Sequence, residues 1–304
     1  MNTPFNEATV EQAALEWLAE LGYECRPGGE IAPGEAQAER ETFAEVVLTE
    51  RLQEAIDRLN PDLPAEALDE AYRQLTRLDG ATQIARNRQF HHWLRDGVEV
   101  EYRRPDGSIK GDRVQLANFD DPEDNDFLAV NQFVIRDGNQ KRIPDIVVFV
   151  NGLPLAVLEL KNPGDENATI DAAFQQLQTY KAEISALFDY NELLVVSDGG
   201  NARLGSLTAG MEWFKPWPTI DDEQPVKGQL PLETLIRGAF APSRLLSLVR
   251  DFTLFEDDAD SDQVFKILAG YHQFHAAQQA VQATLIASST GGDHRCGVVW
   301  HTQG

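Results

Sequence analysis

One hairpin pattern near the middle of this chain constrains its fold more than any other feature. Two apolar runs flank Asn151-Gly152, which predicts a buried β-hairpin. Three charged residues, Asp145, Glu159 and Lys161, stand in a segment that is otherwise almost wholly apolar. Side chains alternate between the faces of a strand, so Glu159 and Lys161 point the same way. Because burying such groups without partners is costly, the pattern predicts a functional site.

The length of the loop decides whether Asp145 faces Glu159. A two-residue turn sets Asp145 opposite Leu158, whereas a three-residue loop sets it opposite Glu159. Two carboxylates directly across a ladder repel each other unless positive charge lies between them. A divalent metal supplies that charge, and oxygen ligands suit Mg²⁺. The alternative is an edge hairpin in which Lys161 pairs with one acid, which still leaves an excess of acid among apolar residues.

The same residues carry a resemblance to known nucleases. Pro144-Asp145 followed by Glu159-Leu160-Lys161 resembles the PD-(D/E)XK nuclease core. That bare pattern fixes only a few residues. The longer string at 144–155 is more specific, and it is similar to the nuclease hairpin in the R (motor/restriction) subunit of type I restriction enzymes.

A second element extends the resemblance, which runs over nearly the whole chain. Gln176 and Tyr180 are similar to the Gln-x-x-x-Tyr element that accompanies the hairpin in this family. The resemblance implies an α/β fold, a PD-(D/E)XK restriction-endonuclease-like core with a mixed sheet flanked by helices. The start of a helicase RecA-like domain would follow that core.

Periodicity along the chain agrees with an α/β order. We expect an endonuclease domain with connecting helices at 1–255. We expect a linker, beginning in the acidic run at 256–262, and the truncated start of a helicase/ATPase domain at 256–304. Residues 211–231 look irregular. Helices are predicted at 9–23, 42–58, 65–78, 170–188 and 232–252, and strands near 98–102, 113–118, 128–136 and 192–197 in addition to the hairpin.

The C-terminal segment also fits this resemblance. Residues 297–304 read as a strand entering a Gly-rich loop, which in the resembled family leads to the Walker A loop. The Gly-Lys-Ser/Thr that holds nucleotide phosphates would lie beyond Gly304, so ATP hydrolysis is not expected from this chain, although ATP is expected for a full-length protein. The resemblance implies that Gln273 contacts adenine. The sequence alone is equally consistent with Gln273 as a surface residue of a helix.

Composition sets limits on location and on DNA binding. The chain has 304 residues and a net charge of -24, which opposes a simple DNA-binding module. No apolar run is long enough for a membrane span, and there is no signal-peptide pattern. Cys25 and Cys296 suggest neither a disulfide framework nor a cysteine metal site. A cytoplasmic protein that does not act at a membrane is expected.

Basic residues gather ahead of the predicted site. They fit either a basic strip that meets DNA or a plain solvated surface. They are Arg73, Arg77, Arg86, Arg88, Arg95, Arg103, Arg104, Lys110, Arg113, Lys141 and Arg142.

Roles for the site residues follow from phosphodiester chemistry and from the resemblance. Asp145 and Glu159 are assigned as Mg²⁺ ligands, with the Leu160 carbonyl as a third candidate. Lys161 orients water and offsets charge on the phosphate. Gln176 and Tyr180 lie on one helix face and would position DNA or Lys161.

Two further sets of residues were weighed. The resemblance implies an acidic metal ligand on the first helix, for which Glu11 is the candidate and Glu7 and Glu16 are alternatives. The adjacent His91 and His92 are read as one packed and one exposed residue.

Two functions remain open from the sequence. The first is Mg²⁺-dependent endonucleolytic cleavage of double-stranded DNA as the nuclease part of a type I complex. In the resembled family, modification (methyltransferase) and specificity subunits and an ATP-driven motor are then required. The second is a non-catalytic docking module that binds partner subunits or DNA. The trio Asp145, Glu159 and Lys161 favours the first.

Overall fold

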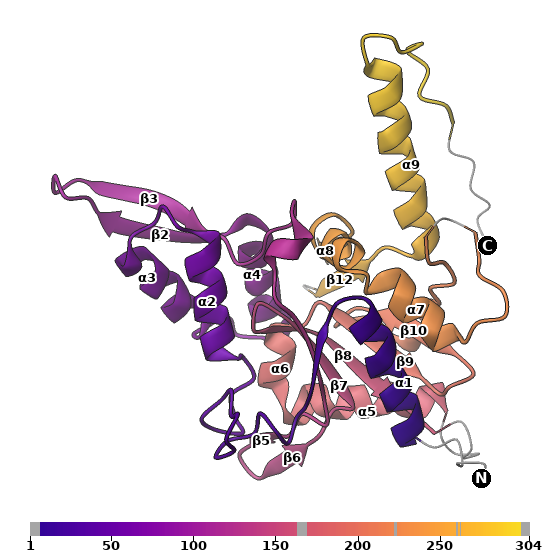
Figure 1. Cartoon of the computed structure of the whole chain (residues 1–304), viewed down its shortest axis with the longest axis horizontal. Helices are drawn as coiled ribbons and strands as arrows, with labels where there is room; N and C mark the ends of the chain where they lie inside the picture. Colours follow the sequence, from indigo (N-terminus) through magenta and orange to yellow (C-terminus); the bar gives the residue numbers. More distant parts are fainter. Residues whose placement is uncertain (1–6, 163–168, 222–223, 260, 262, 299–304) are drawn as a thin grey trace.

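The computed structural model describes residues 7–162, 169–221, 224–259, 261 and 263–298 (Figure 1). Its central sheet contains β1 (Glu24–Pro27), β4 (Phe127–Asn131), β7 (Ile146–Val150), β8 (Leu153–Leu160), β9 (Leu193–Ser197) and β10 (Ala202–Gly205), in the spatial order β1-β4-β7-β8-β9-β10. β1 runs parallel to β4 and β8 parallel to β9, whereas the other neighbours are antiparallel. The sheet is therefore mixed, as expected.

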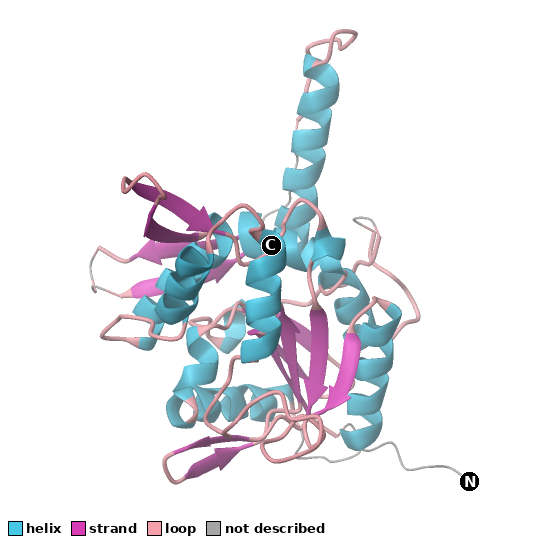
Figure 2. Ribbon diagram, turned by 60° about the vertical axis from the view of Figure 1, so that its left-hand side comes forward, coloured by secondary structure: helices cyan, strands magenta, loops and turns pink. Residues whose placement is uncertain are grey.

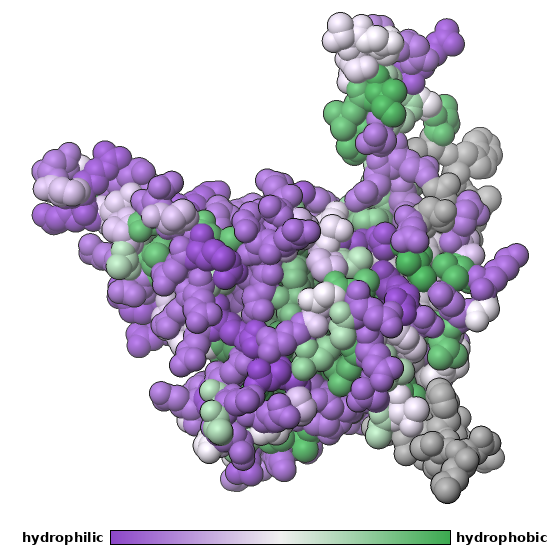
Figure 3. Space-filling view, viewed as in Figure 1, coloured by the Kyte–Doolittle hydropathy of each residue, from purple (hydrophilic) through white to green (hydrophobic). Residues whose placement is uncertain are grey.

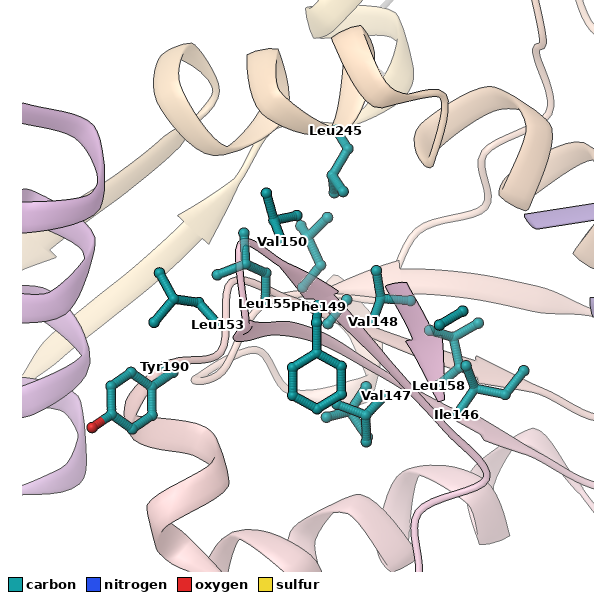
Figure 4. Packing of buried hydrophobic residues seen from close by; sticks show 14 of the residues in the cluster. Ile146, Val147, Val148, Phe149, Val150, Leu153, Leu155, Leu158, Tyr190 and Leu245 are labelled. Carbon is teal, nitrogen blue, oxygen red and sulfur yellow. The ribbon is translucent and has the colours of Figure 1, made fainter. Parts of the chain in front are cut away.

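Helices flank this sheet (Figure 2). The helices of the described chain are α1 (Glu7–Glu20), α2 (Thr49–Leu59), α3 (Ala65–Leu75), α4 (Gln83–Asp96), α5 (Ile170–Glu183), α6 (Ser185–Asp189), α7 (Pro231–Ala239), α8 (Pro242–Asp251) and α9 (Tyr271–Ser288). α1 packs against β1, β4 and β8, and α5 packs against β8 and β9. Figure 4 shows Leu245 of α8 on one side of the β7–β8 hairpin and Tyr190, directly after α6, on the other. Burial on both faces explains why β7 and β8 read as continuous apolar runs.

Three two-stranded hairpins lie outside the main sheet: β2 (Val98–Arg103) with β3 (Ile109–Val114), β5 (Ile135–Asp137) with β6 (Gln140–Arg142), and β11 (Thr253–Asp257) with β12 (Val264–Leu268). Short 3₁₀ turns occur at Pro122–Asp124 and Met211–Trp213. The β2–β3 hairpin and α9 project from the body (Figure 1). Apolar side chains gather on the projecting part of α9 (Figure 3), where Val281, Leu285 and Ile286 are exposed. Within the described ranges, none of the helices is long and apolar enough to cross a membrane.

Several predicted boundaries were wrong for local reasons. The helix predicted at 42–58 begins only at Thr49, because Leu48 instead donates its N–H to Gly152 O in the hairpin turn, at 2.9 Å. The pattern at 232–252 divides into α7 and α8, because Pro242 cannot continue a helix but suits the first turn of a new one. The helix at 170–188 also divides, since Ile184 leaves the helical conformation between α5 and α6.

Two elements were mispredicted because polar residues hide their periodicity. The strand expected at 113–118 lies instead at β3, which is mostly exposed and polar. The helix α4 was not predicted, because Asn87 and His91 occupy its buried face together with Phe90 and Leu94. A pattern search that looks only for apolar residues at helical spacing does not detect such a face.

The buried polar face of α4 belongs to an ionic cluster around Lys266 of β12. The Lys266 side chain is fully buried, and its Nζ lies 2.7 Å from Glu192 Oε2. Lys266 Nζ also donates to Asn87 Oδ1 (3.0 Å) and to Asn191 O (2.7 Å). His91 Nδ1 lies 3.0 Å from the same Glu192 oxygen. We refer to these five residues as the Lys266 cluster; it ties β12 to α4 and to the start of β9.

Burial and charge oppose each other in this cluster. Burial lowers the pKa of Lys266, and Glu192 offsets that effect only in part. Burial raises the pKa of Glu192, but Lys266 and His91 outweigh it, so that the pKa of Glu192 is lowered overall. The prediction that one histidine is packed and the other exposed is confirmed by His91 and His92.

The β11–β12 hairpin bears on the predicted division of the chain. β11 crosses the position between residues 255 and 256 and pairs with β12. Lys266 anchors β12 of this hairpin in the body. The division into an endonuclease and a helicase part stays a prediction.

Candidate active site

The β7–β8 hairpin combines features of both loops that the sequence left open. Its turn has two residues, since Val150 pairs with Leu153, and Asn151 and Gly152 have φ of 52° and 76°. Positive φ at both central residues is what a type I′ turn requires. Gly152 is further restricted, because a Cβ there would lie 2.5 Å from Leu48 O.

A β-bulge then changes the register. Phe149 pairs with Pro154 and Val148 with Ala156, so Leu155 is an extra residue in β8. The last pair of the ladder is Ile146 with Leu158, and continuing this register by one position beyond the strand puts Asp145 opposite Glu159. The turn therefore has two residues, as in the first alternative, but Asp145 stands opposite Glu159, as the three-residue loop of the second alternative would have set it. Pro154 was the available signal, because proline in a central strand is found at bulges.

The bulge brings together the three charged residues of the hairpin. Glu159 is fully buried and Asp145 is 5% exposed. Asp145 Oδ2 accepts a hydrogen bond from Leu160 N at 2.7 Å. Lys161 Nζ lies 2.5 Å from Glu159 Oε1, and its side chain reaches the surface with 13% exposure. The Lys161 N–H donates to Ser197 O of β9 at 2.8 Å, which fixes the end of β8.

The Gln-x-x-x-Tyr pair on α5 reaches the same place. Gln176 Nε2 donates to Tyr180 Oη at 2.6 Å, and the Tyr180 hydroxyl donates to Ile143 O at 3.2 Å. Ile143 stands two residues before Asp145, so α5 holds the chain where it enters the site. Burial raises the pKa of Tyr180, and the negative charges of Glu159 and Asp145 raise it further. The expectation that Gln176 and Tyr180 share one helix face is confirmed.

The first helix contributes one buried acid near the site. Glu11 is 8% exposed and accepts hydrogen bonds from the Asn131 and Gln132 side chains, each at 2.5 Å. Gln132 N in turn donates to Asp145 O at 2.9 Å. Glu16 is exposed and accepts from a neighbouring side chain on α1. The Glu7 side chain lies outside the described part of the structure.

The structure thus links Glu11 to Asp145 through Gln132 rather than placing the two acids together. Considering the described residues alone, no three or more His, Cys, Asp or Glu side chains form a group that could hold a metal ion. Glu11 as a metal ligand stays a prediction. Asn131 and Gln132 were not predicted from the sequence; their signal was a polar pair directly after the apolar run Phe127–Val130.

Gln273 has a structural contact of its own. Its Oε1 accepts a hydrogen bond from Gly270 N at 2.9 Å, which closes the N-terminal end of α9. An adenine contact by Gln273 stays a prediction. Of the predicted strand at 297–304, residues 299–304 lie outside the described residues.

Most of the basic residues ahead of the site are paired with acids, so they do not form an open basic strip. Among those named above, ion pairs bind Arg73 to Glu70, Arg86 to Asp189, Arg88 to Asp257, Arg95 to Asp96, Lys110 to Asp112, Arg113 to Glu99 and Arg142 to Glu183. The reading as a plain solvated surface therefore fits most of this set. Lys141, beside the site, has no ion pair among the described residues.

The fold and the site together define an α/β protein with two facing carboxylates and a lysine at one end of a central hairpin. Comparison with known proteins agrees with this class. Residues 4–213 match the family described as "Type I restriction enzyme R protein N terminus". The chain belongs to that family.

Similar curated proteins carry related names. The chain is 44% identical to the Type I restriction enzyme HindI endonuclease subunit of Haemophilus influenzae, over 98% of this chain and 28% of that protein. It is 32% identical to the Putative type I restriction enzyme MjaIXP endonuclease subunit of Methanocaldococcus jannaschii, over 97% of this chain and 30% of that protein. It is 26% identical to a type I restriction enzyme endonuclease subunit of Staphylococcus aureus, over 98% and 29%. The chain therefore spans less than a third of the length of these relatives.

Proposed function

We propose that this chain cuts double-stranded DNA by hydrolysing phosphodiester bonds, as the nuclease part of a type I restriction-modification complex. The observation that carries the proposal is the bulge at Leu155, which sets Asp145 opposite Glu159 beside Lys161. The order α1, β4, β7, β8, α5, β9 also fits the PD-(D/E)XK nuclease core that the sequence resembles. The names of the relatives support the same reaction.

The donor set fits a hard divalent cation. Asp145 and Glu159 are adjacent, buried and alike in charge, while Lys161 supplies a single positive charge. Carboxylate oxygens with an excess of negative charge suit Mg²⁺. Asp145 and Glu159 would hold the ion, with the Leu160 carbonyl as a further candidate. A bound Mg²⁺ would activate water and offset charge on the phosphate.

The remaining roles fall to the protein's own groups. The Leu160 N–H holds the Asp145 carboxylate in place through its hydrogen bond. Lys161 is the one member of the trio with a partly exposed side chain, so its ammonium is placed to meet a phosphate oxygen as negative charge develops. Tyr180 stays protonated because its pKa is raised; it acts as a hydrogen-bond donor to Ile143 O and not as a base.

The proposal places this chain within a larger assembly in the cytoplasm. The chain covers only 28–30% of its curated relatives, so the rest of a longer protein would supply the ATP-driven motor, including any adenine contact made by Gln273. Modification and specificity subunits would select the DNA. We expect the DNA recognition sequence to be read by those partners and not by the site described here.

The first test is thermal unfolding of this chain with and without Mg²⁺ or Mn²⁺. Binding to the folded state alone raises the apparent stability, so the unaltered chain should melt at higher temperature with metal, and Asp145→Ala should not. The matched control is Asp112→Ala, which removes a half-buried aspartate on β3 that pairs with Lys110; its response to metal should equal that of the unaltered chain.

A second readout tests the reaction itself. In the assembled complex, Asp145→Ala should abolish DNA cleavage and leave ATP hydrolysis largely intact, whereas Asp112→Ala should cut normally. If Asp145→Ala cuts DNA at the normal rate, the assignment of the site is wrong. Absence of a metal effect together with normal cleavage by that variant would favour the non-catalytic docking module.

A further inference from the structure

The β5–β6 hairpin directly precedes Asp145 and carries two cations that face each other. Arg136 of β5 is the cross-strand partner of Lys141 of β6. Both side chains are exposed, and within the described part of the chain neither forms an ion pair. Like charges directly opposite each other destabilise a ladder. In a chain with 50 acidic and 26 basic residues, such a pair is a local exception.

Three contacts hold this hairpin in a fixed position beside the candidate active site. Arg142, next to Lys141, forms an ion pair with Glu183 of α5, the helix that carries Tyr180. Arg136 N donates to Phe43 O at 2.9 Å, and its guanidinium lies 4.9 Å from the centre of the Phe43 ring. Stacking on an aromatic ring orders a guanidinium and leaves its N–H groups free to bind an anion.

The distance to the site suits a nucleic acid backbone. Lys141 stands four residues before Asp145, which at about 3.3 Å per residue is at most roughly 13 Å of chain. Phosphates along one DNA strand follow each other every ~3.4 Å of helix axis. A duplex held at Asp145 would therefore bring phosphates a few nucleotides away close to this hairpin.

We propose that the β5–β6 hairpin binds the DNA backbone next to the scissile bond. Arg136 on β5 and Lys141 on β6 would each contact phosphate oxygens of the DNA. The proposal rests on the proposed function, because it takes DNA as the substrate of the adjacent site. The phosphate removes the repulsion between the two cations. Recognition of this kind carries no sequence information and serves to position the duplex.

The test measures binding of a short fluorescent DNA duplex to this chain at low ionic strength, in the Asp145→Ala background so that no cleavage occurs. Lys141→Glu should weaken binding several-fold. Lys141→Ala should lower the slope of log affinity against log salt by about 1, the change expected for one lost phosphate contact. The matched control is Lys110→Glu, which makes the same change in net charge on the β2–β3 hairpin, where Lys110 already pairs with Asp112.

Arg136 is tested by a substitution that keeps the hairpin folded. Arg136→Gln should weaken duplex binding by a similar factor, and thermal unfolding should show that the variant is as stable as the unaltered chain. Lys141 is exposed, so its variants serve as the reference if Arg136→Gln loses stability together with its contact to Phe43.

Three results would overturn the proposal. They are no measurable duplex binding at low ionic strength, equal losses of affinity for Lys110→Glu and Lys141→Glu, or unchanged affinity for both Lys141→Glu and Arg136→Gln. Failure of the nuclease assignment is a separate outcome. It would appear as normal DNA cleavage by the assembled complex that carries Asp145→Ala. The binding measurement on the isolated chain does not depend on cleavage, so the two failures can be told apart.

Discussion

Two buried clusters in this molecule each pair a glutamate with a lysine, yet their surroundings differ. In the candidate active site, Glu159 lies 2.5 Å from Lys161 and a second carboxylate, Asp145, faces it across the ladder. In the Lys266 cluster, Glu192 lies 2.7 Å from Lys266, and the nearest further groups are His91 and amide or carbonyl oxygens. The active site has two carboxylates beside one lysine, whereas in the Lys266 cluster a lysine and a histidine face one carboxylate.

The two clusters also differ in their access to solvent: the candidate active site is open, and the Lys266 cluster is closed. The Lys161 side chain is 13% exposed, while both side chains of the Lys266–Glu192 pair are fully buried. The closed cluster fixes β12 against the core. The open cluster, with its excess of acid, suits the cation and the anionic substrate that we propose for it. Close approach of a lysine and a glutamate therefore does not identify a functional site; the net charge of the group and its access to solvent do.

The largest expected effect is on the closed cluster. Glu192→Gln leaves Lys266 as an uncompensated buried charge, and removing one partner of a buried pair costs about 3–5 kcal/mol of the free energy of unfolding. Chemical denaturation of the variant measures this. Protein that remains folded should keep its metal-dependent stabilisation. A loss below about 1 kcal/mol would mean that the Lys266 cluster does not anchor β12.

At the open site, the largest effect should fall on the reaction. Lys161→Gln removes the positive charge proposed to meet the phosphate, and loss of one such group typically lowers the rate by roughly 10²–10³-fold. Single-turnover cleavage by the assembled complex measures it. Lys110→Gln, at a half-buried lysine of β3, is the control and should leave the rate unchanged.

A glutamate-to-glutamine change at the open site should affect stability in the opposite direction from Glu192→Gln. Glu159→Gln removes one of two facing carboxylates, so we expect no loss of stability, or a gain of about 0.2–1 kcal/mol, the usual range for a cross-strand charge contact. Metal-dependent stabilisation should disappear. If Glu159→Gln is as destabilising as Glu192→Gln, the charges in the two clusters are balanced alike and the comparison fails.

The smallest effect at neutral pH concerns a third lysine, which has no carboxylate partner in the part of the chain that the structure describes. Lys181 donates to Leu207 O (2.6 Å) and to Gln178 Oε1 (3.2 Å), and burial lowers its pKa to about 8. The unfolded chain therefore binds more protons between pH 8 and the ordinary value near 10.5, so the protein gains stability as pH rises through that window.

Comparison with Lys181→Met isolates this contribution. At pH 7 the two proteins should be close in stability, because the variant loses two hydrogen bonds but also the cost of burying a charge. Above pH 8 the unaltered chain should become more stable relative to the variant. Denaturant titrations at pH 7 and 9.5 measure the difference, and a difference that does not change with pH would contradict it.

Local sequence signals predicted much of the candidate site. Turn chemistry at Asn151-Gly152 and alternation along β8 depend on neighbouring residues only, so the hairpin and the shared face of Glu159 and Lys161 followed from the sequence. The Gln176–Tyr180 pair followed from helical spacing. The mixed sheet was expected from the order of elements and from the family resemblance.

What the sequence could not predict depends on contacts between distant segments. The buried role of Lys266 requires Asn87 and Glu192, which are far from it in the chain, and no local pattern announces such a partner. The link from Glu11 to Asp145 through Gln132 depends in the same way on α1 lying beside β4. The helix α4 was not predicted because its buried face is partly polar. Only the residues that contact this face in the fold explain why polar side chains are buried there.

The extra residue in β8 leads to a counting rule. Across a two-residue turn, directly opposite residues in a regular ladder always differ by an odd number, as Val150 and Leu153 do. Asp145 and Glu159 differ by an even number, 159 − 145 = 14, so with this turn they can face each other only if one strand carries a single extra residue. Parity therefore makes the Leu155 insertion a requirement. A hairpin transplanted to another scaffold without that residue would keep every side chain of the site and lose the site.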